Sequence, residues 1–412
     1  MISAPRSPSD DQAMRWRQVV AVAVCIALNG LDGFDVLAIS FASPGIAAEW
    51  GIGRATLGVV LSVELFGMAT GSVLMGNVAD RFGRKPTVVG CLVMMAAGMF
   101  GAANANTIPM LAAVRLLTGL GIGGMLASTS AIVADVSTER RRNLNLSLNI
   151  AGYPAGAILG GSVATFLLAH SGNWRAVFQF GGLASAVALP LAAVLLPKLE
   201  PTRVRSPATL PLAELFRSGY AYATVLLTAA YLAQIMVFYY IQKWVPKIIV
   251  DMGHTAAEAG AVLVSANVGS LVGACLIGLA AQKYRVIPLI VGAMAAAFLC
   301  IVVFGLGDWS LQQLKLICAI AGVFVNAGVV GLYPLMGQVF PAELRATGIG
   351  FAIGVGRGGA ALGPMAAGAL FSSGYSLLAV STIMGAGALV AAGVLLVLGR
   401  LHSGSSTVGA FP

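Results

Sequence analysis

The sequence contains few charged residues. Lys, Arg, Asp and Glu together make up 9% of its 412 residues, whereas a typical soluble protein contains about 25%. A soluble domain could not cover its surface with so little charge, and a disordered chain would be far more polar. Hydrophobic residues instead make up 58% of the chain. These proportions predict an integral membrane protein that consists almost entirely of spanning segments.

The sequence also lacks the usual signs of an enzyme. It has only three histidines and five cysteines, and none of them shows the spacing of metal ligands. It contains no nucleophile–base pair, no His-Glu-x-x-His motif and no phosphate-binding Gly-Lys-Ser/Thr loop. We therefore predict neither catalysis nor a metal site. A sensory role is a further alternative, but the chain has no soluble segment long enough for a signalling domain.

Long apolar segments fill the chain. A membrane-spanning helix needs about 20 mostly apolar residues, whereas barrel strands run about 10 residues and alternate polar with apolar. The sequence therefore predicts an all-α membrane protein with twelve transmembrane helices. They are expected at residues 18–41, 56–78, 87–105, 108–134, 143–169, 175–196, 220–246, 257–281, 286–306, 311–339, 346–372 and 375–399.

The basic residues indicate how these spans are oriented, because cytoplasmic loops carry an excess of Lys and Arg. With the N-terminus in the cytoplasm, 17 of the 24 basic residues lie on the cytoplasmic side and 5 on the outer side. The other two, Arg115 and Arg357, lie within spans. We predict a multi-pass protein of the bacterial inner-membrane type with both termini cytoplasmic. The net charge of +9 follows from this bias and requires no nucleic acid as a partner.

The longest polar connection divides the spans into two sets of six. A motif of Gly, polar, basic and aromatic residues at 76–82 recurs with the same spacing at 278–284. Two parallel halves with a binding site between them are a known transporter plan. The predicted organisation is a tail at 1–17, a six-helix bundle at 18–196, a linker at 197–219, a second bundle at 220–399 and a tail at 400–412.

Three acidic residues are expected at membrane depth. Asp32 and Asp35 are three positions apart and share one face of the first helix. Two carboxylates in a medium of low dielectric cannot both ionise at low cost, so the pair suits a proton carrier. The alternative is that both lie solvated at the outer mouth. Glu64 could be a second proton site, a partner of an arginine, or an interfacial residue.

The loop after the second span carries a recognisable motif, because residues 76–86 read Gly-Asn-Val-Ala-Asp-Arg-Phe-Gly-Arg-Lys-Pro. It resembles the signature loop of the major facilitator superfamily. Gly76 is expected to let two helices approach closely, and Asp80 to pair with Arg81 or Arg84. A purely topogenic basic loop is the alternative. The predicted gating group consists of Gly76, Asp80, Arg81, Gly83, Arg84 and Asp135.

The sequence Asp32-Gly-Phe-Asp35 in the first span resembles a narrower group, the aromatic acid:proton symporter family. Similar matches occur in the same order along nearly the whole chain, at residues 115–124, 139–142, 173–175, 243–246, 341–348 and 354–364. The resemblance implies two pseudo-symmetric six-helix bundles that import an aromatic carboxylate by alternating access. It also implies protons as the coupling ion, with no other cofactor.

The two arginines within spans are candidates for contact with the substrate or with protons. Arg357 is the first choice for an anionic substrate, because its planar guanidinium matches a carboxylate. Arg115 could assist proton binding at Asp32 and Asp35, and these three residues are also candidate substrate ligands. Either arginine could instead be a purely structural charge.

The seventh and eighth spans supply further candidates for the substrate cavity. Lys243 could attract anions from the outer side, although Lys243 and Lys247 could also simply extend to the membrane interface. The aromatic side chains could stack on a substrate ring or form an interfacial belt. The candidates in these spans are Tyr231, Gln234, Phe238, Lys243, Trp244 and Asn267.

Two alternatives retain the fold and change the cargo. The first is a proton-coupled drug exporter. Exporters of this type resemble one another in a Gly-Pro pair within the fifth span, whereas in this sequence Gly156 is followed by Ala157. A proton symporter for a dicarboxylate, an aliphatic acid or nicotinate is the other alternative. In each case the expected partners are a small organic molecule, protons and the lipid bilayer, and a monomer is expected.

Overall fold

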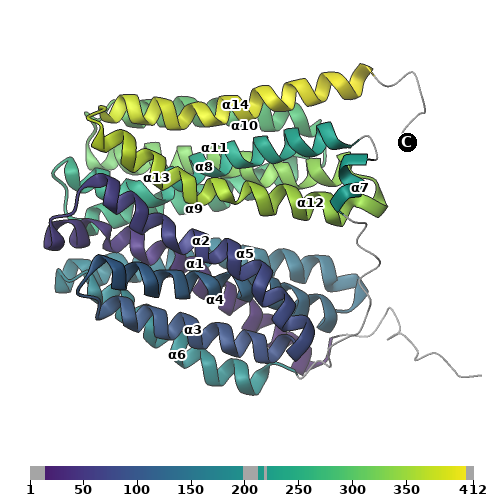
Figure 1. Cartoon of the computed structure of the whole chain (residues 1–412), viewed down its shortest axis with the longest axis horizontal. Helices are drawn as coiled ribbons and strands as arrows, with labels where there is room; N and C mark the ends of the chain where they lie inside the picture. The colour runs from purple at the N-terminus through teal and green to yellow at the C-terminus, as the bar shows by residue number, and fades with distance from the viewer. Residues whose placement is uncertain (1–13, 198–211, 218–219, 405–412) are drawn as a thin grey trace, which may run out of the picture. The chain divides into compact units, whose positions relative to one another are not determined.

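The computed structural model describes residues 14–197, 212–217 and 220–404, and these form fourteen helices without a strand (Figure 1). The helices of the N-terminal part are α1 (Trp16–Trp50), α2 (Arg54–Phe82), α3 (Arg84–Ala103), α4 (Ile108–Val136), α5 (Glu139–Ser171) and α6 (Arg175–Leu195). Those that follow are α7 (Leu212–Arg217), α8 (Ala221–Asp251), α9 (Ala256–Ala280), α10 (Val286–Gly305), α11 (Leu311–Val339), α12 (Ala342–Gly356), α13 (Gly358–Ser372) and α14 (Leu377–Gly404).

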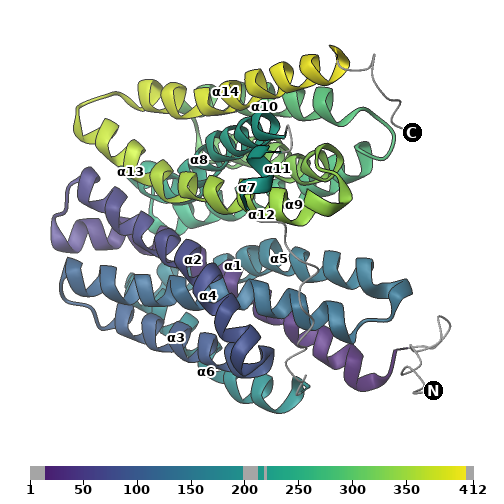
Figure 2. The same cartoon turned by 45° about the vertical axis from the view of Figure 1, so that its right-hand side comes forward.

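The predicted all-helical membrane fold is confirmed. Among the described residues, eleven helices are long and apolar enough to cross a membrane. Each overlaps one of the predicted spans. The eleventh predicted span, 346–372, consists of α12 and α13, which follow one another along the chain (Figure 2). The prediction of one continuous helix there was wrong.

The interruption lies at Arg357, between Gly356 and Gly358. The Arg357 backbone N–H donates to the carbonyl of Ile353 at 2.8 Å, as in an α-helix, but its own carbonyl accepts from Ala360 at 2.9 Å. The second bond spans three residues, so the turn tightens at this point. Glycine has a low helix propensity because it loses much backbone entropy when it is ordered. The glycines on both sides of Arg357 therefore favour a break.

Two further differences concern helix bounds. The first helix, α1, continues to Trp50 through Pro44, whereas the sequence predicts its end near residue 41. The short helix α7 lies inside the predicted linker 197–219. The tails before residue 14 and after 404, and much of the linker, lie outside the described residues.

The chain divides into two compact units. The first comprises Met1–Ala38, Gly67–Gly160 and Arg175–Arg203, and the second comprises Ile39–Phe66, Gly161–Trp174 and Val204–Pro412. Residues of α1, α2 and α5 are therefore divided between the units. The boundaries of the six-helix halves, 18–196 and 220–399, stay a prediction.

Glycines allow α1 and α5 to pack closely in the first unit. A Cβ atom on Gly152 would lie 2.5 Å from the carbonyl oxygen of Ile26, and a Cβ on Gly156 would overlap the backbone of Gly30. Small residues allow this approach because no side chain separates the two backbones. The contact lies within two turns of Asp32 and Asp35 on α1. In the same unit, α3 packs against both α4 and α6 (Figures 1 and 2).

The second unit contains equally close helix contacts. A Cβ on Gly58 of α2 would lie 2.7 Å from the carbonyl oxygen of Pro364 in α13. A Cβ on Gly363 would lie 2.7 Å from the carbonyl oxygen of Met236 in α8. These contacts join α13 to α2 on one side and to α8 on another. Helices α10 and α14 also lie side by side in this unit (Figure 1).

Candidate functional site

The two aspartates of α1 are buried in the first unit. Asp32 is 1% exposed and Asp35 is 0% exposed. This burial contradicts the alternative in which both are solvated at an outer mouth. Neither carboxylate oxygen of Asp32 has a hydrogen-bond partner among the described residues. A buried carboxylate without donors is costly to ionise, so Asp32 can hold a proton.

Arg115 lies beside these aspartates. Its side chain is completely buried, and its Nη2 donates to the backbone carbonyl of Asp35 at 2.9 Å. The other terminal nitrogen, Nη1, contacts the Met99 sulfur at 3.1 Å, and the guanidinium lies 5.4 Å from the Phe178 ring centroid. Of the three residues for which the sequence predicts a joint role, the structure thus places Arg115 against Asp35, and Asp32 lies about one turn away on α1. A fixed positive charge beside an acid can stabilise its ionised form.

Glu64 and Lys243 form an ion pair that the sequence does not reveal. Lys243 Nζ lies 3.5 Å from Glu64 Oε2, and both side chains are 0% exposed. The pair joins α2 to α8 within the second unit. Lys243 therefore does not extend to the membrane interface, and this lysine is a partner of Glu64. Lys247 is 17% exposed and pairs with Asp251.

Arg357 lies among tyrosines in the second unit. Its guanidinium hydrogen-bonds to the Tyr231 hydroxyl and also interacts with Tyr239 and Tyr333. The hydroxyls of Tyr231 and Tyr333 are 3.3 Å apart. Sequence analysis did not select Tyr333, because one tyrosine in an apolar span gives no signal by itself. A guanidinium with phenol groups around it can bind a carboxylate, donate to its oxygens and contact a ring.

Three of the remaining candidate substrate ligands from α8 and α9 form hydrogen bonds to other helices. Gln234 Nε2 donates to the Val325 carbonyl at 2.9 Å, while its Oε1 has no hydrogen-bond partner among the described residues. Asn267 accepts a hydrogen bond from Gln242 at 2.8 Å. Trp244 Nε1 donates to the Pro364 carbonyl at 3.0 Å. Each therefore has a structural contact, and their proposed contacts with substrate stay predictions.

One aromatic candidate makes only ring contacts among the interactions described. Phe238 is half-buried, and its ring meets that of Tyr239 edge-to-face at 5.2 Å between centroids. Tyr239 is one of the tyrosines around Arg357. Phe238 thus lies next to the Arg357 cluster in α8.

The second half of the predicted gating loop, from Arg81 to Arg84, contacts the end of α4 through Arg84. Gly83 has φ 94° and precedes the first residue of α3, a conformation that favours glycine. Arg84 pairs with Asp135 at the end of α4 and donates to the Ala131 carbonyl at 2.8 Å. The guanidinium of Arg81 lies 5.4 Å from the centroid of the Phe82 ring. Arg84 and Asp135 therefore tie α3 to α4.

The first half of this loop departs from expectation. A Cβ on Gly76 would meet no described atom within 4 Å. The prediction that Gly76 permits a close helix contact is therefore wrong for this structure. The side chain of Asp80 lies outside the described part of the chain, so its pairing with Arg81 or Arg84 stays a prediction.

Buried charges inside an apolar helical fold are typical of membrane transporters, and sequence comparison supports this class. The model of the Major Facilitator Superfamily matches residues 23–364. The chain belongs to this superfamily. It is therefore a transporter and not an enzyme.

Several proteins with similar sequences are named as transporters of aromatic acids. The gallate transporter of Pseudomonas putida is 29% identical, with 95% of this chain and 94% of the relative covered. The 3-(3-hydroxy-phenyl)propionate transporter of Escherichia coli is also 29% identical, with 95% and 96% covered. Other relatives are named for 4-hydroxybenzoate, benzoate and gentisate, and one is a putative niacin/nicotinamide transporter of Bacillus subtilis.

Solved structures show the same fold. The nucleoside transporter NupG superimposes with a TM-score of 0.77 at 14% identity, covering 92% of this chain and 99% of that one. A D-xylose–proton symporter gives a TM-score of 0.74 at 17% identity, covering 92% and 96%. At these identities the likeness concerns the fold alone.

Proposed function

We propose that this protein imports a small aromatic carboxylate, of the hydroxybenzoate type, together with protons. The observation that carries the proposal is the Arg357 cluster, in which a guanidinium lies among Tyr231, Tyr239 and Tyr333. This arrangement offers a charge for the carboxylate and phenol groups for the ring and its substituents. The names of relatives that are 29% identical over most of the chain support the same substrate class.

Coupling to protons is proposed from the acids of the first unit. Moving one anion inward against an inside-negative potential costs about 2.3 kcal/mol per 100 mV. One proton per monoanion removes this cost, and a second allows the potential to assist uptake. Asp32 and Asp35 are the proposed carriers, with Arg115 assisting and Glu64 as a further candidate. Asp32 is the leading carrier because its oxygens lack hydrogen-bond partners among the described residues.

Alternating access is the proposed transport mechanism. The moving bodies are the halves 18–196 and 220–399, in a monomer whose termini face the cytoplasm. The proposed gate is the loop with Gly76, Asp80, Arg81, Gly83 and Arg84, together with Asp135. The contact between Arg84 and Asp135 supports part of this gate.

Transport by purified protein in liposomes tests the proposal. Radiolabelled 4-hydroxybenzoate is supplied outside, with the outside more acidic than the lumen. We expect accumulation that a protonophore abolishes, while exchange of labelled for unlabelled substrate continues without a gradient. Accumulation that the protonophore leaves intact contradicts proton coupling.

A panel of acids separates the proposed cargo from its alternative, another organic acid. The panel contains benzoate, nicotinate, succinate and butyrate, each at the same concentration as a competitor of 4-hydroxybenzoate. We expect benzoate to compete and the two aliphatic acids not to compete. Uptake of succinate or butyrate in the absence of aromatic acid uptake contradicts the proposed substrate class.

A further inference from the structure

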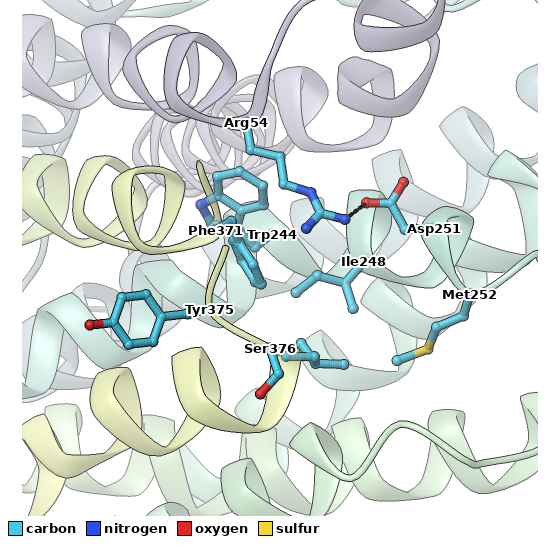
Figure 3. Close-up of a pocket in the computed structure, with 9 residues that line it drawn as sticks. Arg54, Trp244, Ile248, Asp251, Met252, Phe371, Tyr375 and Ser376 are labelled. Carbon is cyan, nitrogen blue, oxygen red and sulfur yellow. Dashed lines mark hydrogen bonds and ion pairs between the residues drawn. The ribbon is translucent and has the colours of Figure 1, made fainter. Parts of the chain in front are cut away.

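A cavity of about 240 Å³ lies in the second unit, away from the Arg357 cluster along α8. It is formed at the start of α2, the end of α8 and the connection from α13 to α14. By the predicted topology, all of these face the outer side of the membrane. The lining residues are Arg54, Trp244, Ile248, Asp251, Met252, Phe371, Tyr375, Ser376 and Leu377 (Figure 3).

The charged side of the cavity belongs to one network of ion pairs, in which Arg54 and Asp251 line the cavity and Lys247 does not. Arg54 Nη2 lies 3.0 Å from Asp251 Oδ2, and Lys247 pairs with the other oxygen of the same carboxylate. These two cations and one anion sum to a charge of +1. The Arg54 side chain is 44% exposed, so an anion from solution can reach it.

The other wall is apolar and aromatic. The rings of Trp244 and Phe371 lie 5.1 Å apart, and the Arg54 guanidinium lies 5.1 Å from the Phe371 centroid. Trp244 and Phe371 are 1% and 7% exposed, so most of their surface is already fixed by packing. Figure 3 shows Arg54 directed toward Asp251 on one side of these rings. A rigid aromatic wall next to a cation suits a flat ring that carries a negative group.

We propose that this cavity is a second binding site, which captures an aromatic carboxylate at the outer entrance of the transporter. The carboxylate binds Arg54 in competition with Asp251, and the ring lies in the cavity beside Phe371 and the exposed Tyr375. Cavities for drug-sized ligands measure about 300–1,000 Å³, so the smaller volume here suits an acid with one ring. The identity of the ligand rests on the proposed function, whereas the charge and the aromatic wall are features of the cavity itself.

Opposite charge changes at Arg54 and Asp251 test the site. Arg54→Gln removes the cation that binds the ligand, whereas Asp251→Asn removes the anion that competes with it. We expect Arg54→Gln to raise, and Asp251→Asn to lower, the concentration of 4-hydroxybenzoate for half-maximal uptake. Each change is about fivefold, the effect of one exposed ion pair. Maximal uptake stays the same in both variants, because transport proceeds through the Arg357 cluster.

A matched control and a direct binding measurement accompany this test. Lys315→Gln removes a basic residue of the same predicted outer side that does not line this cavity, and it leaves half-saturation unchanged. In an Arg357→Gln background, calorimetric titration with 4-hydroxybenzoate reports the outer site alone. We expect binding there that Arg54→Gln removes. The neutral analogue 4-hydroxybenzyl alcohol is expected not to bind.

Two outcomes overturn the inference. If Arg54→Gln and Asp251→Asn shift half-saturation in the same direction, their ion pair acts only as a structural contact. If the Arg357→Gln protein binds no 4-hydroxybenzoate while the wild type takes it up, the cavity is not a site. Failure of the wild type to transport any aromatic acid contradicts the proposed function. In that case, calorimetric titration of the Arg357→Gln protein still shows whether the cavity binds an aromatic carboxylate.

Discussion

Glu64 and Lys243 place opposite charges in a part of the second unit where neither side chain has exposed surface. Removing a buried charge from water is expensive, and the attraction between the partners offsets that cost only while both are present. The pair therefore makes α2 and α8 depend on each other. Replacing one partner removes this attraction while the charge of the other stays buried.

Single substitutions in this pair are expected to destabilise the protein more than the double substitution. Glu64→Gln and Lys243→Met should each cost about 3–5 kcal/mol of stability. The double variant should regain much of this loss, because neither charge has to be buried in it. Thermal unfolding of the purified protein measures the difference. Additive losses in the double variant contradict direct coupling. A Glu64→Gln protein that keeps its stability but loses proton-driven uptake would instead identify Glu64 as a proton site.

Asp32 allows a separate test of proton coupling. Asp32→Asn keeps the shape of the side chain and removes its titratable proton. We expect proton-driven accumulation of substrate to fall at least about tenfold, as for loss of an essential proton carrier. Exchange of labelled for unlabelled substrate should continue, because exchange requires no net proton movement. Ser40→Ala, at another buried polar position of α1, is the control and should retain both activities. Normal accumulation by Asp32→Asn excludes Asp32 as the carrier.

The site residues that sequence can identify are those whose presence in a span is energetically unusual. Asp32, Asp35, Arg115 and Arg357 stand out because a charge in a lipid-facing position is expensive. Tyr333 does not stand out, since tyrosine is common near membrane interfaces. The pairing of Glu64 with Lys243 also escapes prediction, because the residues are 179 positions apart in the chain.

At the scale of the helix, the packing of α8 against α12 and α13 depends on glycine. A Cβ on Gly359 would overlap the Leu232 carbonyl and lie 2.9 Å from the Ile235 side chain. A Cβ on Gly356 would lie 2.5 Å from the Tyr231 ring. A Cβ on Gly354, in contrast, would meet no described atom within 4 Å. The first two glycines are thus required by close packing, and the third is not.

Alanine substitutions should separate these positions. Gly359→Ala is expected to lower stability by about 1–3 kcal/mol, as overpacking of a tight contact does. Gly354→Ala is expected to be neutral or to raise stability by up to about 1 kcal/mol, because alanine has the higher helix propensity. Thermal unfolding of the two variants under the same conditions provides the comparison. Equal losses in both contradict a specific contact between α8 and α13.

Hydrophobic length predicted the helices well because each span must bury about 20 residues in lipid. It could not predict the extension of α1 to Trp50, since polar and small residues such as Ser43 and Gly45 interrupt the apolar run. Nor could it predict the break at Arg357. Local glycine content lowers helix propensity on both sides of this residue, and Gly356 packs against Tyr231 of α8. Gly76 shows the converse, since a family motif suggested a contact that the described residues do not make.

For the whole molecule, the break at Arg357 bears directly on topology. In the part of the chain that the structure describes, eleven helices are each long and apolar enough to cross the membrane alone. Helices α12 and α13 have 15 residues each and are too short to do so separately. If the two together form one crossing, the total is even and both termini lie on the same side. If they enter and leave on one side, the total is odd and the C-terminus lies outside. The excess of basic residues in the predicted cytoplasmic loops favours the even number.

Reporter fusions test this count. Alkaline phosphatase is active only outside the cytoplasm, and green fluorescent protein exported in unfolded form does not fluoresce there. We expect phosphatase activity for fusions at Gly253 and Gly374, and fluorescence for fusions at Lys283 and after Gly404. A phosphatase-active fusion after Gly404 contradicts the prediction that α12 and α13 cross together. A crossing by this pair also holds Arg357 at its centre, at membrane depth. There its attraction for a carboxylate is stronger than in bulk water, which suits a transporter of anions.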